Sequence, residues 1–240
     1  VASGPISFMR IYDSTTDVIK QGGKRRGANI GILQCTHPDI VDFVTAKSGK
    51  RLTNFNISVA VTDAFMRKAV KKQPLVLRSP KTGKTIQKIN AADLFEMIIR
   101  NAWETGDPGL LFLDEINRKH PLKSIGPIEA SNPCGEVPLL PYESCNLGSI
   151  NLARMVTNGK LDWNKLRSTT RLAIHFLDNV IDANNYPLKE TEDITKAHRK
   201  IGLGVMGFAD LLFLLQIPYD SKTALRLGEQ LIKFIAKEAR

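Results

Sequence analysis

Hydrophobic and polar residues follow two periods along the chain, and these periods predict both helices and strands. Apolar residues three and four positions apart are typical of a helix face, whereas short apolar runs between turn residues are typical of strands. The expected helices cover residues 5–19, 62–72, 90–103, 163–181, 204–215 and the chain from 220, with a short one near 37. The expected strands cover residues 28–33, 54–61 and 110–113, and a surface hairpin covers 75–89. Strands that alternate with helices indicate an α/β fold with parallel strands.

The same pattern makes three finer predictions. In the helix that begins near residue 90, one face is expected to carry Leu94, Phe95, Ile98, Ile99, Ala102 and Trp103. Gly202, Gly204 and Gly207 are expected to permit close helix packing or an irregular helix start. The strand pattern fades after residue 151, so further strands are expected beyond residue 240.

Residues 117–151 break the pattern and are rich in Pro, Gly, Ser and Asn. A loop of this length inside a compact domain is usually functional or disordered. Its apolar residues favour an ordered loop. We therefore expect this loop to carry the chemistry of the protein.

Composition narrows the class of protein. The chain has 34 Lys and Arg against 24 Asp and Glu, a net charge of +10, which favours anionic partners such as nucleotides, nucleic acid or phosphate esters. Scattered surface lysines are the alternative explanation of this charge. No apolar run approaches the roughly 20 residues that span a bilayer, and no secretory signal is present, so a cytoplasmic protein without a membrane partner is expected. The first residue is not Met and the chain stops within a helical pattern, so we expect an internal piece of a longer protein.

The three cysteines are Cys35, Cys134 and Cys145, and they lack the spacing of a disulfide framework or a zinc site. Reduced thiols and no metal site are therefore expected. Asn132, Cys134 and Glu136 occupy alternate positions, and in an extended segment they would point to the same side and converge on one small ligand. Cys145 follows eleven residues after Cys134, close enough to return to the same site.

A thiol beside a carboxylate is a poor nucleophile, because the negative charge raises the thiol pKa. No His lies close in sequence to act as a base for Cys134. Loss of a hydrogen atom from a neutral thiol suits this environment better. The carboxylate of Glu136 would then be free to accept a proton from a substrate hydroxyl.

The segment Asn132-Pro133-Cys134-Gly135-Glu136, followed by residues 145–152, resembles the active-site loop of ribonucleotide reductases, most closely the adenosylcobalamin-dependent class II enzymes. The resemblance extends over essentially the whole chain. It implies that residues 1–240 are part of a ten-stranded α/β barrel, truncated at both ends, with a central finger loop. It also implies radical reduction of ribonucleotides to 2′-deoxyribonucleotides with adenosylcobalamin as the cofactor.

The resemblance assigns roles to single residues. It implies that Cys134 is the thiyl that takes the 3′-hydrogen, that Glu136 deprotonates the 3′-hydroxyl and that Asn132 binds substrate together with Pro133 and Gly135. Cys145 would be one of two thiols that reduce the 2′-carbon. Cys35 does not match the position of the second thiol and is interpreted as a structural cysteine.

A second segment resembles the substrate-specificity loop of the family. It consists of Lys20, Gln21, Gly22, Gly23, Lys24, Arg25 and Arg26. Paired glycines let backbone amides approach a ligand, and three consecutive cations suit phosphates or base edges. A solvated basic turn explains the same residues equally well.

The resemblance further implies a nucleotide effector, a thioredoxin-like or glutaredoxin-like reductant and a homodimer, and it leaves a di- or triphosphate substrate open. Two alternatives remain. One is a class I large subunit that receives its radical from a separate metal-containing subunit. The other is a basic nucleic-acid-binding module, which explains the net charge but leaves the segment around Cys134 unexplained.

Overall fold

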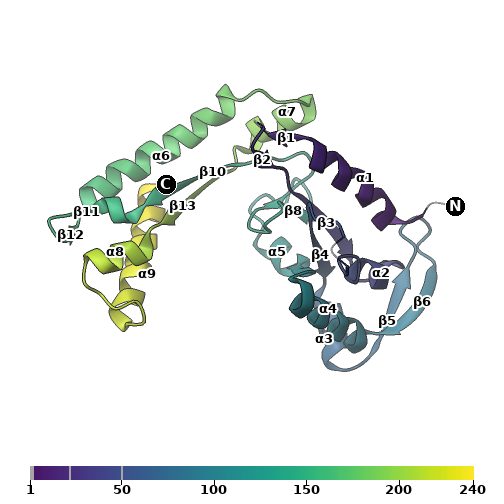
Figure 1. Cartoon of the computed structure of the whole chain (residues 1–240). Coiled ribbons are helices and arrows are strands. Elements are labelled where there is room, and N and C mark those ends of the chain that lie inside the picture. Colours follow the sequence, from purple (N-terminus) through teal and green to yellow (C-terminus); the bar gives the residue numbers. More distant parts are fainter. Residues whose placement is uncertain (1–2, 22, 50) are drawn as a thin grey trace. The chain divides into compact units, whose positions relative to one another are not determined.

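The computed structural model describes residues 3–21, 23–49 and 51–240, and it forms two compact units, Val1–Pro141 and Tyr142–Arg240. Figure 1 shows the helices and strands of both units. Within the described residues, no helix is long and apolar enough to cross a membrane.

The first unit is built on a parallel sheet with the strand order β3-β4-β7. These strands are β3 (Asn29–Gln34), β4 (Phe55–Val61) and β7 (Gly109–Phe112). Register is set by pairs such as Ile32 with Ser58 and Ala60 with Leu111. The prediction of parallel strands joined by helices is confirmed for this unit.

Five helices surround this sheet in the described part of the first unit (Figure 1). They are α1 (Pro5–Val18), α2 (Ile40–Val44), α3 (Asp63–Val70), α4 (Ala91–Thr105) and α5 (Leu113–Lys119). Side chains define where two of them begin: Thr62 accepts a hydrogen bond from the Phe65 amide, and Asn90 accepts one from the Ala92 amide. The predicted positions of these two helix starts are confirmed.

The core of the first unit lies between β4 and the helices. Six of the seven residues of β4 are buried, and they pack with Phe43, Phe65, Leu94 and Ile98. Burial of each such side chain contributes about 1.5–3 kcal/mol to folding. The buried sheet is therefore a stable support for the loops that connect its strands.

The broad apolar face predicted for α4 is only partly correct. Leu94, Ile98 and Asn101 form the buried face, whereas 47% of Ile99 and 85% of Trp103 are exposed. The buried residues follow spacings of four and three. Ile99 directly follows Ile98 and Trp103 lies two residues after Asn101, so at about 100° per residue both side chains point away from this buried face.

Residues 74–90 and 20–26 each contain an antiparallel hairpin of the same unit. The predicted surface hairpin is confirmed as β5 (Pro74–Arg78) and β6 (Thr85–Asn90). The segment expected as a basic loop contains a second, smaller hairpin of β1 (Lys20–Gln21) and β2 (Arg25–Arg26).

The second unit contains a two-stranded parallel sheet of β10 (Asn146–Asn151) and β13 (Ile201–Met206). The predicted long helix is confirmed as α6 (Trp163–Ala183), which buries Leu166, Thr170, Leu177 and Ile181. The remaining elements complete the unit. They are the 3-10 helix η1 (Leu152–Met155), β11 (Val156–Thr157), β12 (Lys160–Leu161), α7 (Lys189–His198), α8 (Phe208–Leu214) and α9 (Lys222–Glu238).

Two predictions about the second unit are wrong. The strand pattern does not end at residue 151, because β13 replaces the first part of the helix expected at 204–215. Glycines have low strand propensity, which hid this strand. At Gly202 an added Cβ would meet the end of the Leu147 side chain on the paired strand, so this glycine lies in close strand packing and not in helix packing. Gly207, with φ of 70°, is the residue at which α8 begins, so the alternative of an irregular helix start is confirmed at this glycine.

The long loop expected at 117–151 is shorter than predicted. Strand β10 occupies its last residues, and the short strands β8 (Ala130–Ser131) and β9 (Pro138–Leu139) pair antiparallel within it. The expectation that this loop is ordered is confirmed.

Candidate active site

Cys134 lies at the tip of the β8–β9 hairpin. The Gly135 amide donates a hydrogen bond to the Asn132 carbonyl at 2.9 Å, which closes a four-residue turn around Pro133 and Cys134. Pro133 fixes its own φ, and Gly135 adopts a φ of 83° that favours glycine. The sequence therefore builds a defined turn that presents the Cys134 side chain to solvent.

Asn132 holds this turn with its side chain. Its Oδ1 accepts hydrogen bonds from the Val137 amide at 2.9 Å and from the Ser131 hydroxyl at 3.2 Å. An Asn that bonds to nearby backbone in this way is typical of tight turns. Its Nδ2 group has no hydrogen-bond partner among the described residues and can donate to a ligand.

The extended backbone predicted for Asn132, Cys134 and Glu136 is wrong, because the chain reverses direction between Asn132 and Val137. The three residues therefore do not meet through strand alternation. They lie within one short turn, in which Cys134 and Glu136 are exposed and Asn132 is half-buried. Turn-forming residues at 133 and 135 signalled this outcome in the sequence.

A residue that the sequence did not single out anchors the turn. Asn56 of β4 donates from its Nδ2 to the Pro133 carbonyl at 2.7 Å. Asn117 fixes the loop before the hairpin through two bonds to the backbone of Ile128. Both contacts span long stretches of sequence, so no local pattern could have revealed them.

Cys145 belongs to the second unit and directly precedes β10. Beside it lies a pocket of about 120 Å³. The lining residues are Ser144, Cys145, Asn146, Val180, Ile181, Asn184, Tyr186 and Thr195. The Ser144 and Thr195 hydroxyls are 2.8 Å apart, which ties the Cys145 segment to α7. The Asn146 Nδ2 donates to the Leu177 carbonyl of α6 at 2.8 Å.

A buried ionic cluster lies two residues before Cys145. The Glu143 side chain is 1% exposed, and its carboxylate contacts the His198 Nδ1 at 2.5 Å and the Lys200 ammonium. A buried carboxylate is stable only with such partners. The cluster therefore fixes the backbone that leads into Cys145, and none of its three members was predicted as a site residue.

Cys35 has the surroundings of a structural cysteine. It is 1% exposed, and burial raises the pKa of its thiol to about 11. The protonated thiol is therefore the dominant form at neutral pH. This agrees with its interpretation as a structural residue.

The predicted specificity loop is only partly described. Gly22 lies outside the described residues, as do the side chains of Lys20, Gln21 and Arg25. The Arg26 guanidinium donates from Nε to the Asn54 Oδ1, so this cation is part of a fixed contact and not only a solvated charge. Lys24 is exposed.

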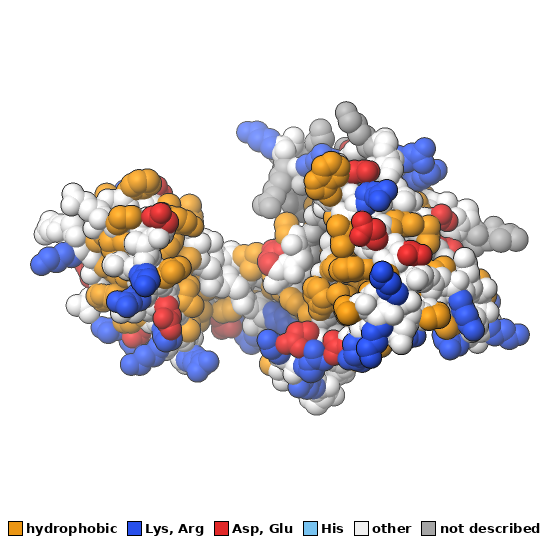
Figure 2. Space-filling view, turned by 90° about the horizontal axis from the view of Figure 1, so that it is seen from below, with side chains coloured by type: hydrophobic (Ala, Val, Ile, Leu, Met, Phe, Trp, Pro, Cys, Tyr) orange, Lys and Arg blue, Asp and Glu red, His pale blue; other side chains and the backbone are white. Residues whose placement is uncertain are grey.

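The basic residues do not gather into one patch on the face that Figure 2 shows. Lys and Arg side chains lie there among acidic and hydrophobic side chains on both units. In the described part of the chain, no group of three or more His, Cys, Asp or Glu side chains could hold a metal ion.

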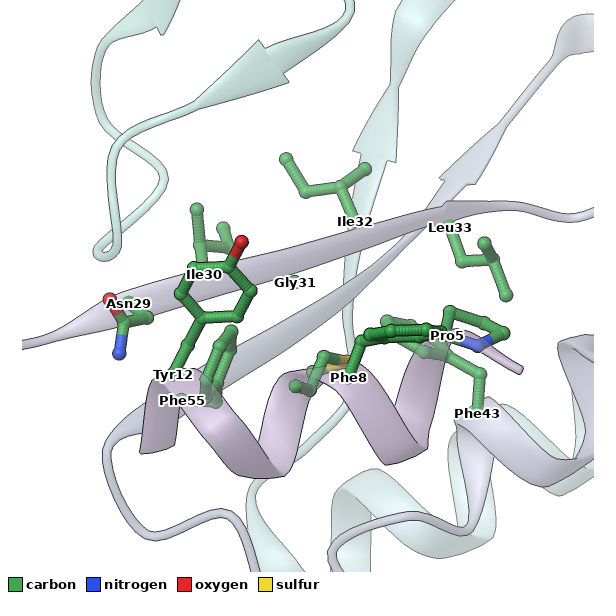
Figure 3. Close-up of a pocket in the computed structure, with 11 residues that line it drawn as sticks. Pro5, Phe8, Tyr12, Asn29, Ile30, Gly31, Ile32, Leu33, Phe43 and Phe55 are labelled. Carbon is green, nitrogen blue, oxygen red and sulfur yellow. The ribbon is translucent and has the colours of Figure 1, made fainter. Parts of the chain in front are cut away.

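A separate apolar groove of about 450 Å³ lies between α1 and β3 (Figure 3). Phe8 and Tyr12 of α1 line it together with Ile30 and Leu33 of β3. Its lining is mostly hydrocarbon, so it does not compete with the Cys134 turn as a site of chemistry.

Comparison with known proteins gives the family. Residues 1–240 match the family described as "Ribonucleotide reductase, barrel domain". The chain is 57% identical over its whole length to the vitamin B12-dependent ribonucleoside-diphosphate reductase of Thermoplasma acidophilum, and covers 32% of that protein. It is 54% identical over 99% of its length to the protein of the same name from Mycobacterium tuberculosis, of which it covers 35%.

A more distant relative is the ribonucleoside-diphosphate reductase subunit alpha of Chlamydia pneumoniae. It is 33% identical over 98% of this chain, which covers 26% of that protein. The chain thus spans about a third or less of the length of these relatives. The match over all 240 residues, together with the Cys134 turn on its mixed α/β scaffold, shows that the chain belongs to the ribonucleotide reductase barrel-domain family.

Proposed function

We propose that this chain carries the active-site turn of an adenosylcobalamin-dependent enzyme that reduces ribonucleoside diphosphates to 2′-deoxyribonucleoside diphosphates. The observation that carries the proposal is the exposed Cys134 at the tip of a defined turn with Glu136 two residues later. The diphosphate and the cofactor follow the names of the relatives that are 54–57% identical.

Cys134, Glu136 and Asn132 each have a different role in the reaction of the ribose. A thiyl radical on Cys134 forms an S–H bond as the 3′-carbon–hydrogen bond breaks. The Glu136 carboxylate accepts the proton of the 3′-hydroxyl. The Asn132 Nδ2 donates to the substrate, because its Oδ1 is already held by the Val137 amide.

Two thiols then supply two electrons. The 2′-hydroxyl leaves as water, and Cys145 forms a disulfide with a second cysteine outside this chain. Cys134 returns its hydrogen to the 3′-carbon and regains the thiyl. The net change is one ribonucleotide and two thiols to one deoxyribonucleotide, water and a disulfide, which a thioredoxin-like or glutaredoxin-like reductant reopens.

The Cys134 turn fits a large planar cofactor. Cys134 is exposed, and the space where Gly135 would carry a Cβ holds no atom within 4 Å. The cofactor would lie against Cys134 and Gly135. When bound, adenosylcobalamin supplies the one-electron chemistry that makes the thiyl, while the chain holds the thiol in position.

The remaining features of the proposal concern the whole protein. A ten-stranded α/β barrel, with the Cys134 turn as its central finger, is the fold that we assign to the whole protein. Residues 1–240 are assigned to part of that barrel. The hairpin of residues 20–26 is assigned to substrate specificity under a nucleotide effector, in a homodimer of the cytoplasm.

The radical source decides between this proposal and a class I enzyme. The full-length protein is incubated anaerobically with adenosylcobalamin, a ribonucleoside diphosphate, an effector and a dithiol, without any second subunit. We expect deoxyribonucleotide product and optical changes from cobalt–carbon bond homolysis. Product that forms only after addition of an iron- or manganese-containing subunit would refute the cobalamin assignment and favour class I.

A further inference from the structure

The peptide that leads into Cys134 is fixed from β4. Asn56 is exposed, whereas every other residue of β4 is buried. Its Nδ2 donates a hydrogen bond to the carbonyl of Pro133, 77 residues later in the sequence, at 2.7 Å. This carbonyl belongs to the same peptide group as the Cys134 nitrogen. The bond therefore restrains the orientation of the backbone that carries the thiol.

Asn54, directly before β4, contacts α1 and the hairpin of residues 20–26. The Asn54 backbone amide donates to the Asp13 Oδ1 at 2.8 Å, and its Nδ2 donates to the Asp13 carbonyl and the Asp17 Oδ1, both at 3.0 Å. The Asn54 Oδ1 accepts from Arg26 of the 20–26 hairpin. Both donors and the oxygen of the buried Asn54 side chain thus form three hydrogen bonds, which join the hairpin and α1 to the start of β4.

Asn54 and Asn56 are separated by one residue, a span of about 7 Å in an extended chain. Between them, Phe55 is buried, and β4 is paired with β3 from this residue onward. A short, paired segment moves as a unit. A displacement of the hairpin that pulls on Asn54 is therefore passed to Asn56 and to the turn.

We infer that Asn56 is a positioning residue for Cys134, and that residues 54–56 mechanically couple the 20–26 hairpin to the Cys134 turn. The inference rests on the proposed function for its catalytic meaning. Its structural content concerns only contacts inside the first unit. A displacement of the 20–26 hairpin would thus be transmitted to the Cys134 turn through the protein and not through a bound substrate.

The first experiment tests Asn56 in the full-length protein. Asn56→Asp removes the donor at nearly constant volume, Asn56→Ala removes the side chain, and Asn56→Gln retains an amide. Asn90→Ala is the matched control, because it also loses one side-chain bond to backbone in the same unit, at the start of α4. Hydrogen exchange of the peptide containing residues 132–137 is measured without substrate.

Loss of one hydrogen bond should raise exchange in this peptide about fivefold in Asn56→Asp and Asn56→Ala. Asn90→Ala should leave it unchanged. In turnover assays, kcat should fall about 10- to 100-fold with KM within about twofold, because a misplaced thiol slows chemistry more than binding. Asn56→Gln should recover part of kcat, which a purely structural loss would not explain.

Unchanged exchange in both Asn56→Asp and Asn56→Ala would overturn the inference. A wild-type protein without reductase activity, but with faster turn exchange in Asn56→Asp, would refute the proposed function and still support positioning by Asn56. The two failures are therefore distinguishable.

The second experiment tests the coupling from the hairpin side. Arg26→Ala breaks the contact to Asn54, and Lys24→Ala removes a neighbouring exposed cation as the control. Exchange at residues 132–137 should rise about twofold in Arg26→Ala and remain unchanged in Lys24→Ala. Equal exchange in the two variants would refute the coupling.

Discussion

The turn that carries Cys134 and the segment that carries Cys145 are held by different forces. The turn is exposed and relies on neutral hydrogen bonds from Asn132 and Asn56. The Cys145 segment follows the buried carboxylate of Glu143, which is held by the His198 ring and the Lys200 ammonium. Neutral surface bonds are individually worth about 1 kcal/mol, whereas removal of one member of a buried ion cluster costs several.

This difference suits two kinds of thiol. A cysteine that meets both a ribose and a cofactor needs an open approach and fine positioning. A cysteine that cycles between thiol and disulfide needs a backbone that survives repeated bond formation. Substitutions at the turn should therefore change the chemistry with little loss of stability. Substitutions near Cys145 should change the chemistry and also lower the stability.

The largest effect is expected at Cys134. In the full-length protein Cys134→Ser should lower turnover by more than about 10³-fold, because an O–H bond is too strong to exchange the hydrogen atom. Nucleotide binding, measured by calorimetry, should stay within about twofold. Appreciable deoxynucleotide formation by this variant would contradict the assigned role.

Cys145→Ser should yield far less than one product per active site, because the disulfide whose formation supplies the two electrons cannot form. Product per active site is counted after rapid quenching, with excess substrate and dithiol. Cys35→Ala is the matched control and should continue to turn over. If Cys35→Ala were instead the variant that stops, the assignment of the redox thiol would be reversed.

Glu143→Gln should destabilise the protein by about 3 kcal/mol, since it leaves the Lys200 charge without its carboxylate in a mostly buried site. Denaturant unfolding of the full-length protein measures this loss. Glu229→Gln on α9, which breaks an exposed ion pair with Lys233, is the control and should change stability little. Equal effects of the two variants would show that burial of the Glu143 cluster does not matter.

Replacement of Arg25 and Arg26 with Ala should change the ratio of kcat/KM between two bases about three- to tenfold under a fixed effector. Basal reduction should change less. Competition assays with paired substrates measure the ratio. An unchanged ratio would show that the 20–26 hairpin has no role in specificity and is a solvated turn with one fixed side chain.

The smallest effect on activity is expected at Cys35. Burial raises the pKa of the Cys35 thiol from its ordinary value of 9.0 to about 11, so the folded state binds the thiol proton more tightly than the unfolded state does. This contribution to stability is present below pH 9 and is lost between about pH 9 and pH 11. Cys35→Ala should remove that part of the pH dependence, as measured by unfolding at several pH values. At pH 8, alkylation of Cys35 should be far slower than alkylation of Cys134.

Local pattern predicted most helices and the parallel strands of the first unit. Thr62, Asn90 and the spacing along α6 act within one or two turns of helix, so their signals are visible in a short window of sequence. The strand β13 was missed because the neighbour of its Gly202 is the side chain of Leu147 on the paired strand. Such a cause is distant in sequence and cannot be found by periodicity.

The sequence by itself determined the chemistry available to this protein: an amide, a thiol and a carboxylate within five residues, and a second thiol eleven residues after the first. Only the tertiary structure decided how these groups are held. It made the Cys134 segment a turn instead of an extended strand, and placed Asn56 against Pro133. It also buried Glu143 between His198 and Lys200. The identity of the residues sets which reactions are possible. The positions of the side chains are set by long-range hydrogen bonds and by burial, which depend on segments that meet only after folding.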